Sequence, residues 1–352
     1  MLRTIVRKGI DLHYDRLHRR EAGQALRTVE GQTKKILAKA VRHQAEEYAY
    51  NALGSRVFAP WLFVYSAIAD EFREGWIPDN YYGRIVCPRI NGAFRSISGV
   101  KTLTQRLFQS DRIPDSGYLI DGRFFDRHLK PIPIEDAARV VFFESNDVVV
   151  KIDSSGKGRG VRSFSRREFD PVALAASTAQ AVIQTRISQH RIFDEFVPGG
   201  ATTLRLTTVR EPDATFRTRA AYLRIPCGGH KFVQSSSSIR VAVDLASGVL
   251  AGAGYLSDWT RVASHPETGA AFKGVQIPGY FEAIKLCQDL HATVPQVGCI
   301  GWDVIVDTAS RVWLLEWNAG HNDVRFSEAL TGPCFLGLGW ECLEPAERVW
   351  QM

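Results

Sequence analysis

The sequence lacks paired cysteines, long apolar runs and biased tracts. Its six cysteines are scattered and form no Cys-x-x-Cys pair, which favours reduced thiols over a disulfide framework or a zinc site. The longest apolar stretch, residues 57–69, holds thirteen residues and contains Pro60, whereas a membrane-spanning helix needs about 20. We therefore expect this stretch to belong to a hydrophobic core. With 45% hydrophobic and 23% charged residues, the chain has the composition of an ordinary globular protein.

The first fifty residues show no secretory leader and carry most of the net charge. They contain no continuous apolar segment followed by a small-residue cleavage site, so we expect a cytoplasmic protein. Eleven Lys and Arg stand there against six Asp and Glu, and the whole chain of 352 residues has a net charge of +6. Such a segment suits a solvated helix face, the anionic inner surface of a membrane or an acidic partner protein. No nucleic-acid-binding motif accompanies it, so we expect no nucleic-acid partner.

The distribution of helix-forming and β-branched residues predicts a helical beginning followed by a mixed region. Residues 1–55 predict about two helices, and residues 60–97 predict short helices and loops. Strands are then predicted at 117–120, 139–143, 147–153, 201–210, 216–225, 299–306 and 312–317. Helices are predicted at 101–109, 170–184 and 279–294, the second with Asp170 as its N-cap and Pro171 in its first turn.

Two carboxylates interrupt the apolar runs of the predicted strand pair 299–306 and 312–317. Asp303 lies in the run GWDVIVD and Glu316 in VWLLEWN, thirteen residues apart, so on a hairpin they can face each other. Buried carboxylates side by side repel unless a cation lies between them, and a hard divalent ion such as Mg²⁺ prefers oxygen ligands. Asn318, two residues further on the same face, adds a neutral oxygen. The alternative is a pair of surface carboxylates on an edge strand.

A glycine-rich loop follows the predicted strand 147–153. Mg²⁺ is usually bound by few carboxylates together with substrate phosphates, so the metal site predicts a nucleotide above it. Lys151 ends the strand, and the loop SSGKGRG at 154–160 comes directly after it. Glycines let backbone N–H groups approach phosphate oxygens while a lysine supplies charge. The loop matches neither the P-loop nor the dinucleotide-binding pattern, and a plain surface turn is the alternative.

The order of these segments resembles the ATP-grasp superfamily, and most closely its sugar-transfer-associated branch, over roughly residues 95–325. The resemblance is carried by GVKTLTQRLF, VVVKIDSSGKGRGV, IFDEFVPGG, TTLRLTTV, CIGWDVIVD and VWLLEWN. It implies an α+β fold in which two subdomains close on ATP. The domains expected from it are a mostly helical N-terminal region (1–95), an N-terminal subdomain (96–195) and a C-terminal subdomain (196–352).

The resemblance also implies roles for individual residues. Asp303 would bind one Mg²⁺, Glu316 would bridge two, and Asn318 would complete the second, with Mn²⁺ as an alternative ion. Backbone groups near Glu195 and Val197 would hold adenine in a hinge between the subdomains. The cofactor-binding residues implied are Lys101, Lys151, Ser155, Gly156, Gly158, Glu195, Phe196 and Val197. Arg205, Arg224 and Arg240 are candidates to neutralise a transferring phosphate or a developing oxyanion, or they are surface and core-edge residues.

Some positions depart from the family pattern or remain open. Many ATP-grasp ligases carry an arginine two residues before the first metal aspartate, where this chain has Gly301, so either Arg224 or Arg240 supplies that charge or the reaction differs. An acidic residue for the ribose is replaced by residues 201–203 (Ala-Thr-Thr). His265 and His321 are each either a general base or a structural histidine.

The function implied first is an ADP-forming carboxylate–amine ligase, with a carboxylate–thiol ligase as a variant. ATP would phosphorylate a carboxylate, and an amine would displace phosphate from the acyl phosphate to form an amide. The name of the branch implies a link with cell-surface polysaccharide synthesis, so a uronic acid joined to an amino acid is a reasonable pair of substrates.

Two other functions fit the same residues. The first is a kinase that delivers the γ-phosphoryl group to a hydroxyl. The second is a nucleotide-binding scaffold, docked by its basic N-terminal segment to a membrane-bound glycosyltransferase complex.

Overall fold

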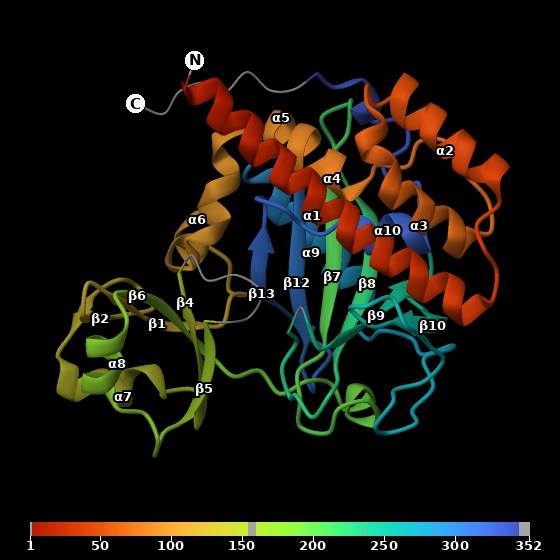
Figure 1. Cartoon of the computed structure of the whole chain (residues 1–352). Coiled ribbons are helices and arrows are strands. Elements are labelled where there is room, and N and C mark those ends of the chain that lie inside the picture. The colour runs from red at the N-terminus through yellow and green to blue at the C-terminus, as the bar shows by residue number, and fades with distance from the viewer. Residues whose placement is uncertain (1, 154–159, 235, 345–352) are drawn as a thin grey trace.

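Two antiparallel sheets carry the structure, and helices from the N-terminal third pack beside the larger one (Figure 1). The computed structural model describes residues 2–153, 160–234 and 236–344. The smaller sheet has the strand order β3-β2-β1-β6-β4-β5, and the larger one has the order β11-β10-β9-β8-β7-β12-β13. A helical region followed by two antiparallel sheets, each with its own helices, is the α+β fold that the resemblance implies, and the prediction is confirmed.

The strands fall into two consecutive stretches of the chain. The smaller sheet is formed by β1 (Asp115–Ile120), β2 (Arg123–Asp126), β3 (Pro131–Ile132), β4 (Asp147–Ile152), β5 (Val161–Ser165) and β6 (Gln180–Thr185). The larger sheet is formed by β7 (Thr203–Arg210), β8 (Phe216–Pro226), β9 (Ser238–Val243), β10 (Leu250–Tyr255), β11 (Arg261–Val262), β12 (Cys299–Val306) and β13 (Val312–Asn318).

Most of the helices precede the first strand. They are α1 (Leu2–Thr33), α2 (Lys39–Asn51), α3 (Ala59–Ala69), α4 (Asp79–Tyr81), α5 (Cys87–Asn91) and α6 (Thr104–Phe108), with the short turns η1 (Arg56–Phe58), η2 (Tyr82–Val86), η3 (Gly92–Gly99) and η4 (Lys101–Leu103) between them. Later come η5 (Ile134–Asp136), α7 (Ala137–Val141), α8 (Pro171–Ser177), η6 (Arg191–Glu195), α9 (Tyr280–Ala292), α10 (Arg325–Leu330) and η7 (Trp340–Cys342). No helix in the described part of the chain is both long and apolar enough to cross a membrane. All six cysteines are free thiols.

The apolar stretch at 57–69 is a core element, as predicted. Within it, helix α3 buries Trp61 and Tyr65, which pack with α1, α10 and residues near the C-terminal end of the described chain in one hydrophobic cluster that includes Phe326 and Trp340. The N-terminal helices therefore share a core with segments more than 200 residues away. The three-part division at residues 95 and 195 remains a proposal.

Two predicted elements in the smaller sheet are wrong. Residues 139–143 were expected to form a strand, but α7 runs through Val141 and leaves Phe143 86% exposed. A helix was expected over 170–184, but α8 ends at Ser177, and β6 begins at Gln180. Its predicted N-terminus is confirmed, since Asp170 accepts hydrogen bonds from two backbone N–H groups of the first turn.

Tertiary pairing explains why the second half of that segment is a strand. β6 lies between β1 and β4 and pairs antiparallel with both, so its residues 181–183 are buried on each side. A short apolar run cannot be assigned to a helix or a buried strand by periodicity alone. The β-branched Val182 and Ile183 favour the strand once two neighbouring strands are present.

The larger sheet has one apolar and one polar face near its β12–β13 edge. Trp302 and Trp317 are register partners whose rings lie 6.4 Å apart. Both are buried in one hydrophobic cluster together with side chains of helix α9. Because side chains alternate along a strand, the neighbours Asp303 and Glu316 point to the opposite face. The hydrophobic packing of the tryptophans thus decides which way the carboxylates point.

A buried hydrogen-bonded chain connects β12, β7 and α9 beneath that sheet. Trp302 Nε1 donates to Thr208 Oγ1 at 2.7 Å, and Thr208 Oγ1 lies 2.7 Å from His291 Nδ1. His291 Nε2 lies 2.7 Å from the carbonyl oxygen of Val297, which can only accept. Nε2 therefore carries the proton, Nδ1 accepts from the Thr208 hydroxyl, and the neutral imidazole satisfies the whole chain. Burial lowers the pKa of His291 to about 4, although the bond to Val297 opposes this shift.

We expect His291 to make the protein less stable in acid. Its folded pKa lies below the unfolded value of about 6.5, so the unfolded state binds the extra proton and stability is lost as pH falls from 6.5 towards 4. The full shift corresponds to about 3 kcal/mol. Urea unfolding at several pH values should show that His291→Gln is less stable than the wild type at pH 7 but loses less stability on acidification. Equal losses in both proteins would contradict the neutral, buried assignment.

Candidate active site

Four strands bring one row of functional side chains to the polar face of the larger sheet. Glu316 on β13 lies opposite Asp303 on β12, Asp303 lies opposite Arg205 on β7, and Arg205 lies opposite Tyr222 on β8. Residues directly opposite each other in an antiparallel sheet point to the same face. The two carboxylates therefore face each other on a hairpin, as their spacing predicts.

A β-bulge places the row against the smaller sheet. The pairing passes from Asp303–Glu316 to Val304–Leu314, so Leu315 has no partner across the ladder. Its carbonyl oxygen accepts a hydrogen bond from Lys151 Nζ on β4 at 2.9 Å. Leu315 and Glu316 both line the same cavity, which strict alternation along a strand would prevent. The bulge thus joins the lysine of one sheet to the carboxylate row of the other.

Arg205 and Asp303 form a buried bidentate ion pair. Arg205 Nε donates to Asp303 Oδ1 at 2.7 Å, and Nη2 donates to Oδ2 at 2.8 Å. Arg224 Nη1 donates to the same Oδ2 at 3.3 Å. Burial by itself raises the pKa of Asp303, but the two guanidinium groups outweigh it and hold that pKa below its usual range. Asp303 is therefore a carboxylate at neutral pH although it is only 6% exposed.

Gly301 provides the room for this arginine. A Cβ atom at position 301 would lie 2.7 Å from Cβ of Asn322 and 3.2 Å from Nη1 of Arg205. Arg205 Nη1 also donates to the carbonyl oxygen of Asn322 at 2.9 Å. Arg205, from the neighbouring strand β7, therefore occupies space beside Gly301 that a larger side chain at 301 would need.

Two lysines lie close to the row formed by Glu316, Asp303, Arg205 and Tyr222, which we call the carboxylate row. Lys101 is 7% exposed, and its Nζ lies 4.0 Å from Glu316 Oε1. Lys151 is 8% exposed, and burial lowers its pKa, although Glu316, Asp115 and Asp303 oppose this shift. These are the two lysines that the resemblance assigns to the nucleotide. Segments far apart in the sequence thus meet at one place.

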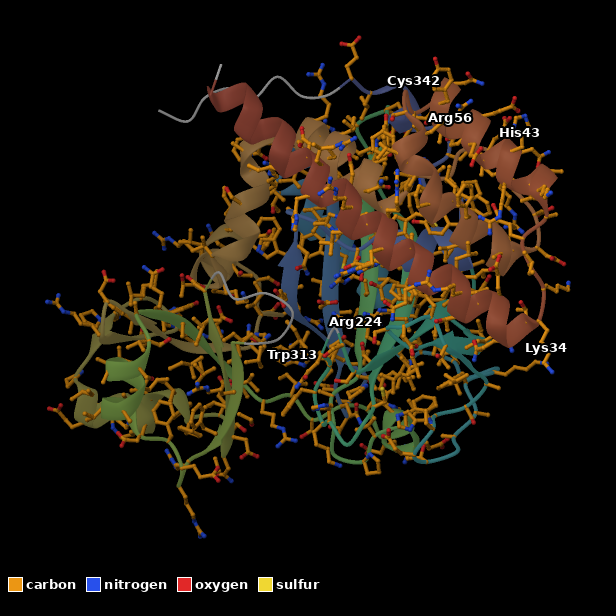
Figure 2. All side chains as sticks on the ribbon, viewed as in Figure 1. Lys34, His43, Arg56, Arg224, Trp313 and Cys342 are labelled. Carbon is orange, nitrogen blue, oxygen red and sulfur yellow. The ribbon has the colours of Figure 1, made fainter. Side chains whose placement is uncertain are left out.

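A cavity of about 610 Å³ lies between the two sheets and contains this group. One end is lined by apolar side chains, namely Val149, Val161, Ile305 and Leu315 from the two sheets and Ile187 from the segment after β6. The other end is lined by polar, charged and aromatic side chains, among them Tyr222, Arg224, Arg240, His321, Asp323, Arg325 and Phe326. Figure 2 labels Arg224 near the middle of the molecule. Sequence reasoning missed Tyr222, Asp323, Arg325 and Phe326. Tyr222 lies in a predicted strand whose cavity face the sequence does not identify, and no element was predicted for 323–326.

The residues that the resemblance implies for adenine do not line this cavity, and their role stays a prediction. Glu195, Phe196 and Val197 do not line the cavity: Phe196 and Val197 belong to the core of the larger sheet, and Glu195 is exposed. The backbone of Val197 is also engaged, because its N–H donates to Phe193 and its carbonyl oxygen accepts from the Gln189 side chain at 2.8 Å.

The segment that lines the cavity instead is 184–187, where the chain leaves β6. It was missed because residues 170–184 were assigned to one helix. The sequence did contain a usable pattern, since the polar run Gln184-Thr185-Arg186 directly follows the β-branched pair at 182–183.

The remaining predicted residues fall in different places. Asn318 lines the cavity, and its Nδ2 donates to the carbonyl oxygen of Gly301 at 3.4 Å. Arg240 lines it as well and is 3% exposed. His265 is 1% exposed and lies against the Pro226 carbonyl oxygen, outside the cavity. His321 lines the cavity. Ser155, Gly156 and Gly158 lie outside the described residues.

The donor set at the carboxylate row suits Mg²⁺. The described residues contain no cluster of three or more His, Cys, Asp or Glu able to hold a metal. Magnesium needs less, since it usually takes one or two carboxylates and completes its shell with water and phosphate oxygens. Asp303 accepts three hydrogen bonds and keeps about one of its roughly four acceptor sites. Glu316 has a side chain 33% exposed, and Asn318 adds an amide oxygen, so the donors are oxygens alone.

Comparison with known proteins identifies the family. A model of the family described as sugar-transfer associated ATP-grasp matches residues 146–336, more than half of the chain. The protein therefore belongs to the sugar-transfer associated ATP-grasp family. No curated protein matches the sequence.

Several solved structures are similar to this chain. A biotin carboxylase from Campylobacter jejuni in a complex described as β-γ-ATP shares 12% identity over 91% of this chain and 67% of its own, with a TM-score of 0.47. A D-cycloserine synthetase shares 14% identity over 72% of this chain and 74% of its own, with a TM-score of 0.42. The biotin carboxylase domain of a Hydrogenobacter thermophilus 2-oxoglutarate carboxylase shares 12% identity over 70% of this chain, with a TM-score of 0.41. This chain spans only 44% of the last one's length.

We expect the Arg205–Asp303 pair to show a rescue in a double-variant cycle. Arg205→Met should destabilise the protein by about 3 kcal/mol, because it leaves the buried Asp303 carboxylate without its bidentate partner. Adding Asp303→Asn removes that charge and should recover at least half of the loss. The measurement is the free energy of unfolding from urea titrations of the wild type, both single variants and the double variant. A double variant no more stable than Arg205→Met would show that the charge pairing is not the source of the cost.

Proposed function

We propose that this protein is an ATP-dependent ligase that activates a carboxylate as an acyl phosphate and joins it to an amine. One observation carries the proposal: Lys101 from the turn η4 and Lys151 from the smaller sheet line the same cavity of about 610 Å³ as Glu316 and Asp303 of the larger sheet. Membership of the ATP-grasp family supports the same reading. The finer identity of the substrates, including a sugar-linked acid, is part of the proposal.

The nucleotide would occupy the end of the cavity that faces the smaller sheet. The apolar side chains from both sheets suit the two faces of a purine ring, and the segment 184–187 would run along its edge. The triphosphate would then extend towards Lys101 and Lys151. A buried lysine next to carboxylates stays cationic when it gains an anionic partner, which favours phosphate binding at this place.

The reacting carboxylate would lie next to Arg224. The Arg224 guanidinium donates to Asp303, but Arg205 already balances the charge of that carboxylate. Arg224 can therefore neutralise charge that develops on the transferring phosphoryl group. Mg²⁺, held by Glu316, Asn318 and the remaining lone pair of Asp303, would supply further neutralisation of the phosphate oxygens. Positioning and charge neutralisation are the main demands of phosphoryl transfer.

The test is turnover of ATP in the presence of paired acids and amines. Uronic acids and other carboxylates combined with amino acids should release ADP and inorganic phosphate together with an amide product seen by mass spectrometry. Glu316→Gln should lower the rate at least a hundredfold, on the scale of losing one charge-neutralising group. Glu282→Gln, which removes an exposed carboxylate from α9, is the matched control and should not change it. A phosphorylated acceptor without free phosphate would identify a kinase, and turnover indifferent to every acid and amine would end the ligase proposal.

A further inference from the structure

Helix α1 presents a row of basic side chains to the solvent. Its buried residues Ala22, Ala25 and Val29 face the core that the N-terminal helices share. Because an α-helix has about 3.6 residues per turn, residues 16, 20 and 27 lie on its opposite side, where they are exposed. The exposed basic residues along the helix and at its end are Arg16, Arg19, Arg20, Arg27 and Lys34, which we call the basic stripe. At about 1.5 Å per residue, the basic stripe is about 27 Å long.

The carboxylates of α1 are matched by arginines of other elements, so they do not balance the basic stripe. Three of its four acidic residues form ion pairs with η2, α10 and α2. These pairs are Asp15 Oδ1 with Arg84 Nη1 at 2.7 Å, Glu21 Oε2 with Arg325 Nη1 at 3.4 Å, and Glu30 Oε1 with Arg42 Nη2 at 3.2 Å. In the described part of the chain, no carboxylate forms an ion pair with a residue of the basic stripe. The outward charge of α1 is therefore available to an anionic partner.

Apolar side chains are exposed at both ends of the basic stripe. Ile10 and Leu12 are 58% and 56% exposed, and Leu12 lies four residues before Arg16 on the same side of the helix. Ile36, which is 82% exposed, follows Lys34 at the other end. Positive charge together with exposed apolar side chains is what holds a segment in the headgroup region of an anionic membrane. A partner that offered only negative charge would leave the apolar ends in water.

The shape of this surface suits a planar partner. Figure 1 shows α1 as one continuous rod that crosses the outside of the molecule in front of the larger sheet, and Figure 2 shows Lys34 at the outer edge. A lipid surface offers anionic groups at every position, so the basic stripe can meet it without a matched spacing of carboxylates, which an acidic protein would need. Arginine and lysine also keep their charged ends at phosphates while their aliphatic stems lie along apolar surface. A group of roughly four to eight basic residues on a helix is typical of anionic-lipid recognition.

We infer that the basic stripe docks this protein on an anionic lipid surface, with Leu12 and Ile36 entering the headgroup region. The contact is reversible, because it combines charge attraction with shallow insertion of a few apolar side chains. It does not depend on the proposed ligase activity, since none of these residues lines the cavity. Docking confines the cavity to the membrane surface, so substrates that are themselves held there meet it at a raised local concentration.

The test is co-sedimentation of the full chain with vesicles of phosphatidylcholine alone and of equal parts phosphatidylcholine and phosphatidylglycerol. At about 0.1 M salt, the wild type should bind the anionic vesicles at least tenfold more tightly than the neutral ones. Salt at about 1 M should remove most of this difference, because the screening length falls from about 10 Å to about 3 Å. The combined variant Arg16→Gln, Arg20→Gln and Arg27→Gln should weaken binding to the anionic vesicles at least tenfold. Leu12→Gln should weaken it at least threefold.

The matched control is the combined variant Arg123→Gln, Lys130→Gln and Arg167→Gln, which removes three exposed charges around the smaller sheet and should bind like the wild type. Equal binding of the wild type to both kinds of vesicle, or equal weakening by the two combined variants, overturns the inference. Binding to poly-glutamate without binding to anionic vesicles also overturns it and assigns the basic stripe to an acidic protein. Circular dichroism of each variant shows whether the fold is retained. Because the readout is binding to vesicles, failure of the ligase proposal would leave this result unchanged.

Discussion

The arrangement of this cavity depends on the ion pair between Arg205 and Asp303. Its two short hydrogen bonds cross from β7 to β12 where water has almost no access, so neither charge can be removed without leaving the other buried. The third donor of Arg205 binds the Asn322 carbonyl oxygen. This contact fixes the start of the segment that carries Asp323 and Arg325, so the ion pair sets both the position of the Asp303 carboxylate and part of the cavity wall.

The second constraint joins the two sheets. The Leu315 bulge aligns the two sheets by freeing a carbonyl oxygen that accepts a hydrogen bond from Lys151. The same bulge lets Leu315 and Glu316 face the cavity together. An apolar side chain and a carboxylate that both line the cavity therefore follow each other in the chain without an intervening residue.

Sequence reasoning succeeds where a local pattern and the tertiary contacts agree. Asp303 and Glu316 interrupt runs of buried β-prone residues, so both the hairpin and the facing carboxylates could be predicted. It fails in the segment 170–184, where an alanine-rich run with a good N-cap resembles one helix, and the strand β6 exists because β1 and β4 lie on either side of it. That error hid the segment 184–187, which lines the cavity.

Other parts of the site depend on contacts that no local pattern encodes. The Leu315 bulge is a difference in pairing between two strands, and a single strand's sequence does not specify it. Phe326 meets Arg240 because α10 packs against the N-terminal helices and the β8–β9 end of the sheet together. Predicting that contact requires the whole fold.

The most direct test of the account is whether the cavity between the sheets binds a nucleotide with magnesium. Calorimetric titration of the wild type and Lys151→Met with a non-hydrolysable ATP analogue, with and without Mg²⁺, measures this. The account predicts binding that requires Mg²⁺ and that Lys151→Met weakens at least tenfold. A folded wild-type protein that binds no nucleotide under either condition would contradict it.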